Sequence, residues 1–241
     1  MYVSKEGHDN NSCLTESAEH NCKTLKFAIE NIGTASGMIK VMTSEKETEK
    51  TRNIDIHKDV RRIVVNGENV NEENLQSSII CNYVFKIQRE SINHEHSLNF
   101  QGIRFLEVKI LVSNAKVHFQ NCILLSVSIK TFEKEKHDTL IVYFEACIFG
   151  TRNFSYGNEL NGKYNEISIG KAKACHLLVK NCSIAETIFV ISSEYFSVKF
   201  LSVTFNLKSN SYSAITIHKM YTWFVARNLV KLDNITVLGM I

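Results

Sequence analysis

Residues 98–105 read LNFQGIRF, residues 117–124 read VHFQNCIL and residues 142–149 read VYFEACIF. These stretches share one eight-residue pattern. Apolar residues hold its first, third, sixth and eighth places, and a small or turn-forming residue holds the fifth. Further copies of this octet begin at Leu177, Val198 and Val230. The recurrence of like residues at the same places predicts stacked, repeated coils.

Each octet contains two short strands and a bend. The first and third places, and then the sixth and eighth, keep the two-residue period of a strand, and the phase slips between them. The residues at the fifth place, where the chain turns, are Gly102, Asn121, Ala146, Asn181, Ser202 and Asn234. A bend there keeps the apolar side of both strands inward. The pattern therefore predicts an all-β solenoid.

Shorter apolar pairs between the octets indicate a further strand in each coil. They are Ile110 and Val112, Val127 and Ile129, Ile167 and Ile169, Phe189 and Ile191, and Ile215 and Ile217. The octets begin 19, 25, 35, 21 and 32 residues apart. These intervals indicate a coil of about 20 residues with polar insertions, which solenoids place outside as loops.

The chain before the octets is less regular. Residues 1–22 are polar and predicted to be irregular, and apolar residues three and four apart in 23–32 predict an amphipathic helix. Short strands are expected at 38–42, 54–56, 62–65 and 79–87. We expect a single domain over 1–241, with an N-terminal segment and cap helix in 1–35, irregular early coils in 36–97 and regular coils in 98–241.

Five of the seven cysteines fall into two kinds, and Cys81 and Cys175 are left unassigned. Cys13 and Cys22 lie in the polar N-terminal segment, at a spacing that suits a small disulfide loop. Cys122, Cys147 and Cys182 share the sixth place of the octet, where we expect buried free thiols stacked in a column. A disulfide between neighbouring coils is the alternative, because parallel strands lie about 4.8 Å apart. No cysteine pair has the spacing of a zinc site, and we expect no metal.

The N-terminal motif and the octets together resemble a known superfamily. The motif consists of Tyr2, Val3, Ser4, Gly7, Asp9, Cys13, Cys22, Thr24 and Leu25, followed by the expected helix. It resembles the start of right-handed parallel β-helix proteins of the pectin-lyase-like superfamily. Octets of the form V-x-F-x-N-C-x-F are similar to coils of large extracellular β-helix proteins of invertebrates. The resemblance implies a right-handed parallel β-helix whose open N-terminal end is capped by the helix.

Charge and motifs argue against several function classes. The net charge of +3, from 28 basic and 25 acidic residues, is too balanced to indicate nucleic-acid binding. No run approaches the roughly 18 apolar residues of a membrane span. Phosphate-binding loops and nucleophile elbows are also absent from the sequence, and we expect no cofactor.

Glycosylation sequons occur at Asn10, Asn153, Asn181 and Asn234. Asn10 and Asn153, in polar segments, are the glycosylation candidates, whereas Asn181 and Asn234 hold the corner place, where asparagine is expected to cap a turn. Together with the resemblance, these features favour an extracellular or cell-surface location.

The distribution of carboxylates argues against catalysis. Glycosidases need two carboxylates about 5 to 10 Å apart. Within the octets the only carboxylates are Glu145 and Asp233, on distant coils. The alternative is a polysaccharide lyase or glycoside hydrolase with a loop-borne site, for which Glu159 and Glu166 are the nearest pair.

Aromatic residues in or near the insertions favour binding. The candidate ligand-binding residues are Tyr156, Tyr164, Tyr212 and Trp223. A faintly basic strip of outer octet residues accompanies them: Gln101, Gln120, Lys180, Lys199 and Lys231. We therefore predict a non-catalytic extracellular recognition or structural module that binds a glycan or another surface protein. A purely architectural spacer is the third possibility.

The last octet ends at Val237, close to Met240 and Ile241. An apolar coil without a cap leaves an open strand edge. From this we expect either that residues 1–241 are a segment of a longer protein or that the last coil pairs end to end with a partner chain.

Overall fold

The computed structural model describes residues 1–4, 6–14, 20–32, 37–41, 52–56, 62–67, 79–81, 83–88, 97–131, 139–150, 165–207, 214–219 and 229–239. Its helical elements are η1 (Asn11–Leu14), a 3-10 helix, and α1 (Leu25–Glu30). The strands are β1 (Tyr2–Val3), β2 (Gly37–Val41), β3 (Arg52–Ile56), β4 (Arg62–Gly67), β5 (Ile79–Cys81), β6 (Tyr83–Gln88), β7 (Ser97–Gln101), β8 (Arg104–Leu106), β9 (Lys109–Ser113), β10 (Ala115–Gln120), β11 (Ile123–Leu125), β12 (Ser128–Thr131), β13 (Thr139–Glu145), β14 (Ile148–Gly150), β15 (Asn165–Lys180), β16 (Ser183–Ile184), β17 (Thr187–Leu207), β18 (Ala214–Lys219) and β19 (Leu229–Gly239).

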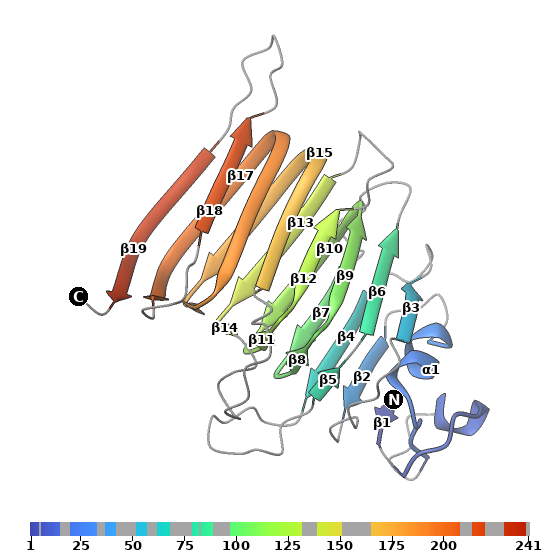
Figure 1. Ribbon diagram of the computed structural model, residues 1–241. Coiled ribbons are helices and arrows are strands. Elements are labelled where there is room, and N and C mark those ends of the chain that lie inside the picture. The colour runs from blue at the N-terminus through green and yellow to red at the C-terminus, as the bar shows by residue number, and fades with distance from the viewer. Residues whose placement is uncertain are drawn as a thin grey trace.

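The strands form three parallel ladders, here termed the first, second and third faces (Figure 1). The first face contains β1, β2, β4, β7, β10, β13, the second half of β15, the middle of β17 and the start of β19. The second face contains β5, β8, β11, β14, β16 and the ends of β17 and β19. The third face contains β3, β6, β9, β12, the starts of β15 and β17, and β18.

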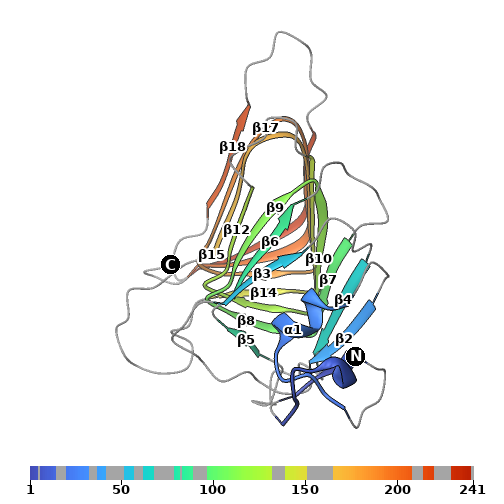
Figure 2. The ribbon, with the colours of Figure 1, turned by 90° about the vertical axis from the view of Figure 1, so that its right-hand side faces the viewer.

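Each coil visits the three faces in turn. Strands β7, β8 and β9 form one coil, and the next coil places β10, β11 and β12 beside them, strand for strand. The three faces enclose the interior, as the view in Figure 2 shows. This stepwise parallel pairing defines a β-solenoid and confirms the predicted parallel β-helix.

One residue turns each coil from the first face to the second. The fifth place of every octet has a positive φ: 63° at Gly102, 52° at Asn121, 52° at Ala146, 53° at Asn181, 54° at Ser202 and 52° at Asn234. Glycine and asparagine adopt this left-handed conformation most readily. The prediction that this place bends the chain is confirmed, and the backbone conformation explains its residue types.

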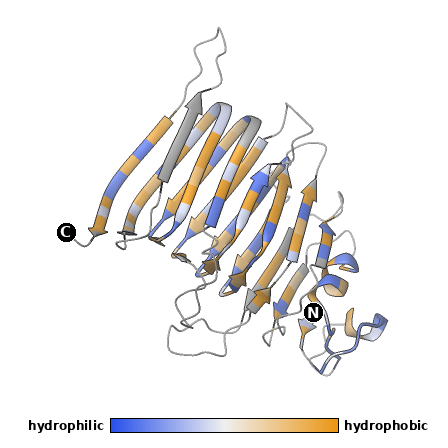
Figure 3. Cartoon of the chain, in the orientation of Figure 1, coloured by the Kyte–Doolittle hydropathy of each residue, from blue (hydrophilic) through white to orange (hydrophobic). Residues whose placement is uncertain are grey.

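Columns of like residues fill the interior. Phe100, Phe119 and Phe144, at the third place, stack with ring centroids 5.4 and 5.0 Å apart. Phe105 and Phe149, at the eighth place, contact this column edge to face at 5.0 Å. All five are buried. The strands alternate apolar and polar residues along their length (Figure 3), so the apolar side of each strand faces the core.

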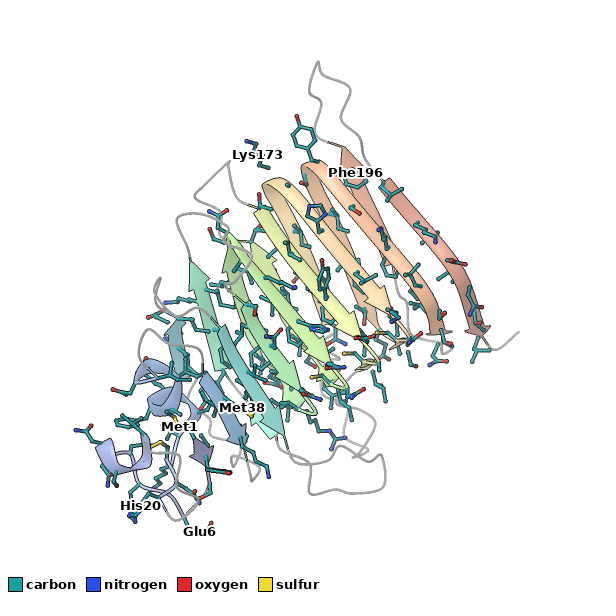
Figure 4. All side chains as sticks on the ribbon, turned by 180° about the vertical axis from the view of Figure 1, so that it is seen from behind. Met1, Glu6, His20, Met38, Lys173 and Phe196 are labelled. Carbon is teal, nitrogen blue, oxygen red and sulfur yellow. A yellow bond between two sulfur atoms is a disulfide. The ribbon has the colours of Figure 1, made fainter. Side chains whose placement is uncertain are left out.

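The N-terminal end of the solenoid is closed. One edge of β1 pairs with β2, and its other edge bonds to Cys22: the Ser4 N–H donates to the Cys22 carbonyl and the Cys22 N–H to the Tyr2 carbonyl, each at 2.9 Å. The amino terminus of Met1 donates to the Met38 carbonyl at 3.2 Å, and both residues lie at this end in Figure 4.

A helix and a disulfide complete this closure. α1 lies at the N-terminal end of the solenoid (Figure 1), with Leu25, Ala28 and Ile29 buried. The predicted Cys13–Cys22 disulfide is present. The described part of 1–22 is largely without regular structure, as predicted, but it contains the short elements β1 and η1, which the disulfide and the β1 pairing hold in place.

The N-terminal motif builds this cap. A Cβ atom at Gly7 would lie 2.3 Å from the Cys22 carbonyl oxygen, so only glycine fits there. The Asp9 carboxylate accepts the N–H groups of Lys23 and Thr24, both at 2.9 Å, and the Thr24 hydroxyl at 2.8 Å. Thr24 is in turn the N-cap of α1. Each of these residues therefore has a structural role.

The remaining strand predictions hold with one difference. The apolar pairs between the octets lie in register on the third face, where Ile110, Ile129, Ile167, Phe189 and Ile215 form one row. The single strand expected over 79–87 is two strands, β5 and β6, on different faces. Both β5 and β6 are rich in apolar residues, so periodicity alone did not reveal that the chain changes face between them.

Candidate functional site

Most of the site residues predicted from the sequence lie outside the residues that the structure describes. Tyr156, Tyr164, Tyr212, Trp223, Asn153 and Glu159 all lie outside the described residues. Asn10 is exposed, and its side-chain oxygen accepts the Ser12 N–H at 3.1 Å and the Ser12 hydroxyl at 2.5 Å. Glu166 lies on the third face, where its carboxylate contacts Lys130 Nζ at 2.7 Å.

The outward side chains of the first face form rows across the coils, and together they are termed the outer first-face surface. One row holds the second places of the octets: Asn99, His118, Tyr143, Leu178, Lys199 and Lys231. A parallel row holds the fourth places: Gln101, Gln120, Glu145, Lys180, Leu201 and Asp233. The residue before each octet adds a third row: Ser97, Lys116, Ile141, His176, Ser197 and Leu229.

Tyr143 contacts two basic residues on this surface. Lys116 Nζ lies over its ring, 5.1 Å from the centroid. The His118 ring meets the Tyr143 ring edge to face, with centroids 6.0 Å apart. Tyr143 is half-buried, so one part of the ring packs against its neighbours and another part is open to solvent. A ring of this kind provides an apolar platform beside a cation.

Glu145 links three coils on the same surface. Lys180 Nζ donates to Glu145 Oε1 at 2.9 Å, and His118 Nε2 lies 3.9 Å from Glu145 Oε2. Burial lowers the pKa of His118; the Glu145 charge opposes this shift and the Lys116 charge adds to it. The His118 imidazole is therefore neutral at pH 7, and its contact with Glu145 is polar rather than ionic.

The outer first-face surface carries an excess of positive charge. Its lysines are Lys116, Lys180, Lys199 and Lys231, and its carboxylates are Glu145 and Asp233. The basic strip expected from the sequence exists, but the register divides it: Gln101, Gln120 and Lys180 lie in one row and Lys199 and Lys231 in the next.

On the third face, two lysines are paired with acidic residues. Lys130 pairs with Glu166 at 2.7 Å, and Lys86 pairs with Asp55 at 3.8 Å. The third face therefore offers matched lysines for control substitutions.

The free cysteines among the described residues are buried. Cys122, Cys147 and Cys182 are free thiols on neighbouring coils, as predicted, and the Cys147 N–H donates to Cys182 Sγ at 3.4 Å. Burial raises the pKa of Cys147, whereas the Cys147 thiol and then burial raise the pKa of Cys182. Burial raises the pKa of Cys175 to about 12. Thiols in this state do not act as nucleophiles.

The outward residues give a site that sequence reasoning did not select. The sequence pointed to Glu145 only as an isolated carboxylate, and it did not single out Tyr143 or His118 as site residues. Reading the second and fourth places of successive octets as columns, in the way that the apolar places were read, would have brought the three residues together.

Among the described residues, no group of three or more His, Cys, Asp or Glu side chains is placed to hold a metal ion. No helix in the same part of the chain is long and apolar enough to cross a membrane. Comparisons with protein families, with curated proteins and with solved structures find no match for the chain. Function must therefore be inferred from the fold and the outer first-face surface.

Proposed function

We propose that the chain is a non-catalytic recognition module that binds an acidic polysaccharide on its outer first-face surface. The observation that supports this most is the cluster around Tyr143, where a half-buried ring lies beside Lys116 and His118 and next to the Glu145–Lys180 pair. A tyrosine ring stacks on the apolar face of a sugar, and lysines pair with carboxylate or sulfate groups.

The repeat of the solenoid suits a linear polymer. The rows of the outer first-face surface recur once per coil, at about 4.8 Å. A polysaccharide that runs along the solenoid axis would meet Lys199 and Lys231 in the row that contains Tyr143. Because each exposed lysine contributes little alone, we expect affinity to come from several such contacts and to fall with salt.

We also propose that this module is of the pectin-lyase-like type and acts outside the cell. The helix-capped N-terminal end, together with the structural roles of Gly7 and Asp9 in it, supports the first part. The Cys13–Cys22 disulfide supports the second, because such bonds persist in oxidising compartments. Asn10, in an exposed sequon of the same segment, is the proposed glycosylation site.

A polysaccharide lyase or hydrolase is the second candidate, favoured by the neutral His118 imidazole beside Glu145. A hydrolase needs a second carboxylate within about 10 Å. On the described surface the other carboxylate is Asp233, three coils from Glu145. At the usual strand spacing this separation is roughly 14 Å, which is too far. The geometry therefore favours binding over hydrolysis.

Binding to immobilised polygalacturonate and heparin, with neutral dextran beside them, tests the proposal. We expect retention on the acidic polymers that decreases with added salt, without release of new reducing or unsaturated ends. Tyr143→Ala and the double variant Lys116→Ala/Lys199→Ala should each weaken binding about fivefold or more, the equivalent of roughly 1 kcal/mol.

The matched control is Lys86→Ala/Lys130→Ala, which removes two lysines from the third face. It should bind as the parent does. An equal loss in this control would mean that net charge alone is responsible, and no retention on either acidic polymer would contradict the proposal. New ends that disappear in His118→Gln would instead identify a lyase, and ends that disappear only in Glu159→Gln/Glu166→Gln would identify a loop-borne site.

A further inference from the structure

β19 exposes residue types that the preceding coils bury. Val230, Leu232 and Val237 hold the first, third and eighth places of the last octet and are 48%, 60% and 61% exposed. Their counterparts Val198 and Phe200, one coil earlier, are fully buried. β19 pairs with β17 along one edge, and no other described strand pairs with the opposite edge. This end therefore combines an apolar layer with a free strand edge.

The opposite end of the solenoid is not complementary to β19. The outer edge of β1 is already bonded to Cys22, and the disulfide-linked segment and α1 cover this end. A head-to-tail stack of copies, which would extend without limit, is therefore blocked. Self-association through β19 must be tail to tail, which by symmetry gives a closed dimer.

We propose that two copies of the chain pair through β19, antiparallel, about a two-fold axis that passes through Leu232. An axis perpendicular to the first face reverses the strand direction but leaves the inner side of the sheet on the inside. Leu232 then lies beside Leu232 of the second copy, and Val230 joins the same apolar layer. The two free edges satisfy each other's backbone hydrogen bonds.

The charges on β19 select this register. Lys231 Nζ lies 3.2 Å from Asp233 Oδ2 within one chain, and both side chains are more than half exposed. An axis at Leu232 sets Lys231 opposite Asp233 of the second copy, twice, so four charges alternate in sign. An axis at Lys231 or at Asp233 would instead oppose like charges, which is unfavourable in a cross-strand pair. An axis at Val230 would oppose Leu229 and Lys231 and would form no ion pair.

The dimer does not depend on the proposed function, although it bears on it. The two-fold axis keeps both outer first-face surfaces on the same side of the assembly. At the junction, the row with Lys199 and Lys231 continues into the row with Asp233 and Lys180 of the second copy, so the outward rows of the two chains form one continuous surface.

Sedimentation velocity of the full 241-residue chain over a concentration series tests the pairing. We expect a species of twice the 27.5 kDa chain mass at the higher concentrations. Leu232→Lys should weaken association at least tenfold. Lys231→Asp and Asp233→Lys should each be monomeric alone, because like charges then oppose each other across the axis. An equimolar mixture of these two variants should restore the dimer, because every cross-strand pair is again of opposite sign.

The mixture also controls for folding, since two misfolded variants would not restore a defined dimer. Lys86→Asp, a charge reversal on the third face, should leave association unchanged. A monomer at every concentration would overturn the proposal, as would a mass that grows beyond two chains. A dimer that persists in Asp233→Lys alone would overturn the register centred on Leu232.

Discussion

The two ends of the solenoid differ in how their apolar residues and strand edges are covered. At the N-terminal end, α1, η1 and the Cys13–Cys22 disulfide lie against the first coil, and the outer edge of β1 is bonded to Cys22. At the C-terminal end, the described part of β19 leaves Leu232 and Val237 more than half exposed. A repeat fold buries apolar residues only between neighbouring coils, so each end needs a cover of its own.

From this difference we expect stability to depend on the cap and the covered coils, and the proposed pairing of two copies to depend on β19. The cap buries apolar residues within one molecule, and substitutions there should change the free energy of unfolding. β19 has the same octet but is covered by no described strand on its outer side, so substitutions there should change the proposed contacts between molecules more than folding.

The largest expected effect is a difference in the free energy of unfolding between substitutions at two residues that hold the third place of their octets. Phe144 stacks on Phe119 in mid-solenoid, whereas Leu232 is 60% exposed at the end. Phe144→Ala should lower the free energy of unfolding by about 3–5 kcal/mol, because it leaves a cavity in a packed column. Leu232→Ala should lower it by less than about 1 kcal/mol in dilute solution. Urea unfolding of both variants checks this, and equal costs would contradict the assigned burial.

The second effect concerns the covalent part of the cap. Cys13 and Cys22 are 9 residues apart. Replacement of both by alanine should lower the free energy of unfolding by about 2–3 kcal/mol, as expected for a loop of this size. Urea unfolding with and without reductant measures the effect. Reductant should destabilise the parent and leave the double variant unchanged; a parent indifferent to reductant would show that the disulfide contributes nothing.

A smaller effect is expected from the carboxylate that orders the cap. Asp9 accepts hydrogen bonds from two backbone N–H groups and from Thr24. Asp9→Ala should lower the free energy of unfolding by about 1–2 kcal/mol, because those donors at the start of α1 lose their acceptor. Asp55→Ala, which removes an exposed ion pair with Lys86, is the control and should cost under about 0.5 kcal/mol. Thermal unfolding distinguishes the two, and a reversed order would refute the capping role.

The smallest effect concerns the residue with positive φ at the fifth place of the octet, where the chain turns from the first face to the second. Ala146 has a φ of 52°, whereas asparagine holds the same corner in the coils on either side, at Asn121 and Asn181. Ala146→Asn should raise the free energy of unfolding by about 0.5 kcal/mol, because asparagine tolerates the left-handed conformation better than alanine. Asn121→Ala should lower it by a similar amount. Calorimetry measures both changes in the free energy of unfolding. Changes of opposite sign would support the corner assignment, and changes of the same sign would contradict it.

The fold was predictable because each octet contains the two strands that flank the corner between the first and second faces. Its apolar places identify the buried sides of the first and second faces, and its fifth place identifies the left-handed residue between them. The cap was predicted only in part. Residues 1–22 form no period of their own, and their order depends on long-range partners such as Asp9 with Thr24.

The candidate surface was less predictable. Whether Tyr143 lies beside Lys116 and His118 depends on the register between coils, and insertions of unequal length hide that register in the sequence. The aromatic residues nominated for binding lie in those insertions, outside the described residues, and their role stays a prediction.

The parallel ladders have a mechanical consequence. Hydrogen bonds between successive coils point along the solenoid axis, so a pull along that axis would open them a few at a time rather than shear a whole sheet. Opening would begin at β19, because among the described strands only β17 pairs with it, whereas α1 and the N-terminal segment cover the other end. A coil without insertion, such as the 19 residues from Leu98 to Lys116, would release about 65 Å of extended chain. Under tension the molecule would therefore lengthen in successive steps of at least this size, from the C-terminal coil toward the cap.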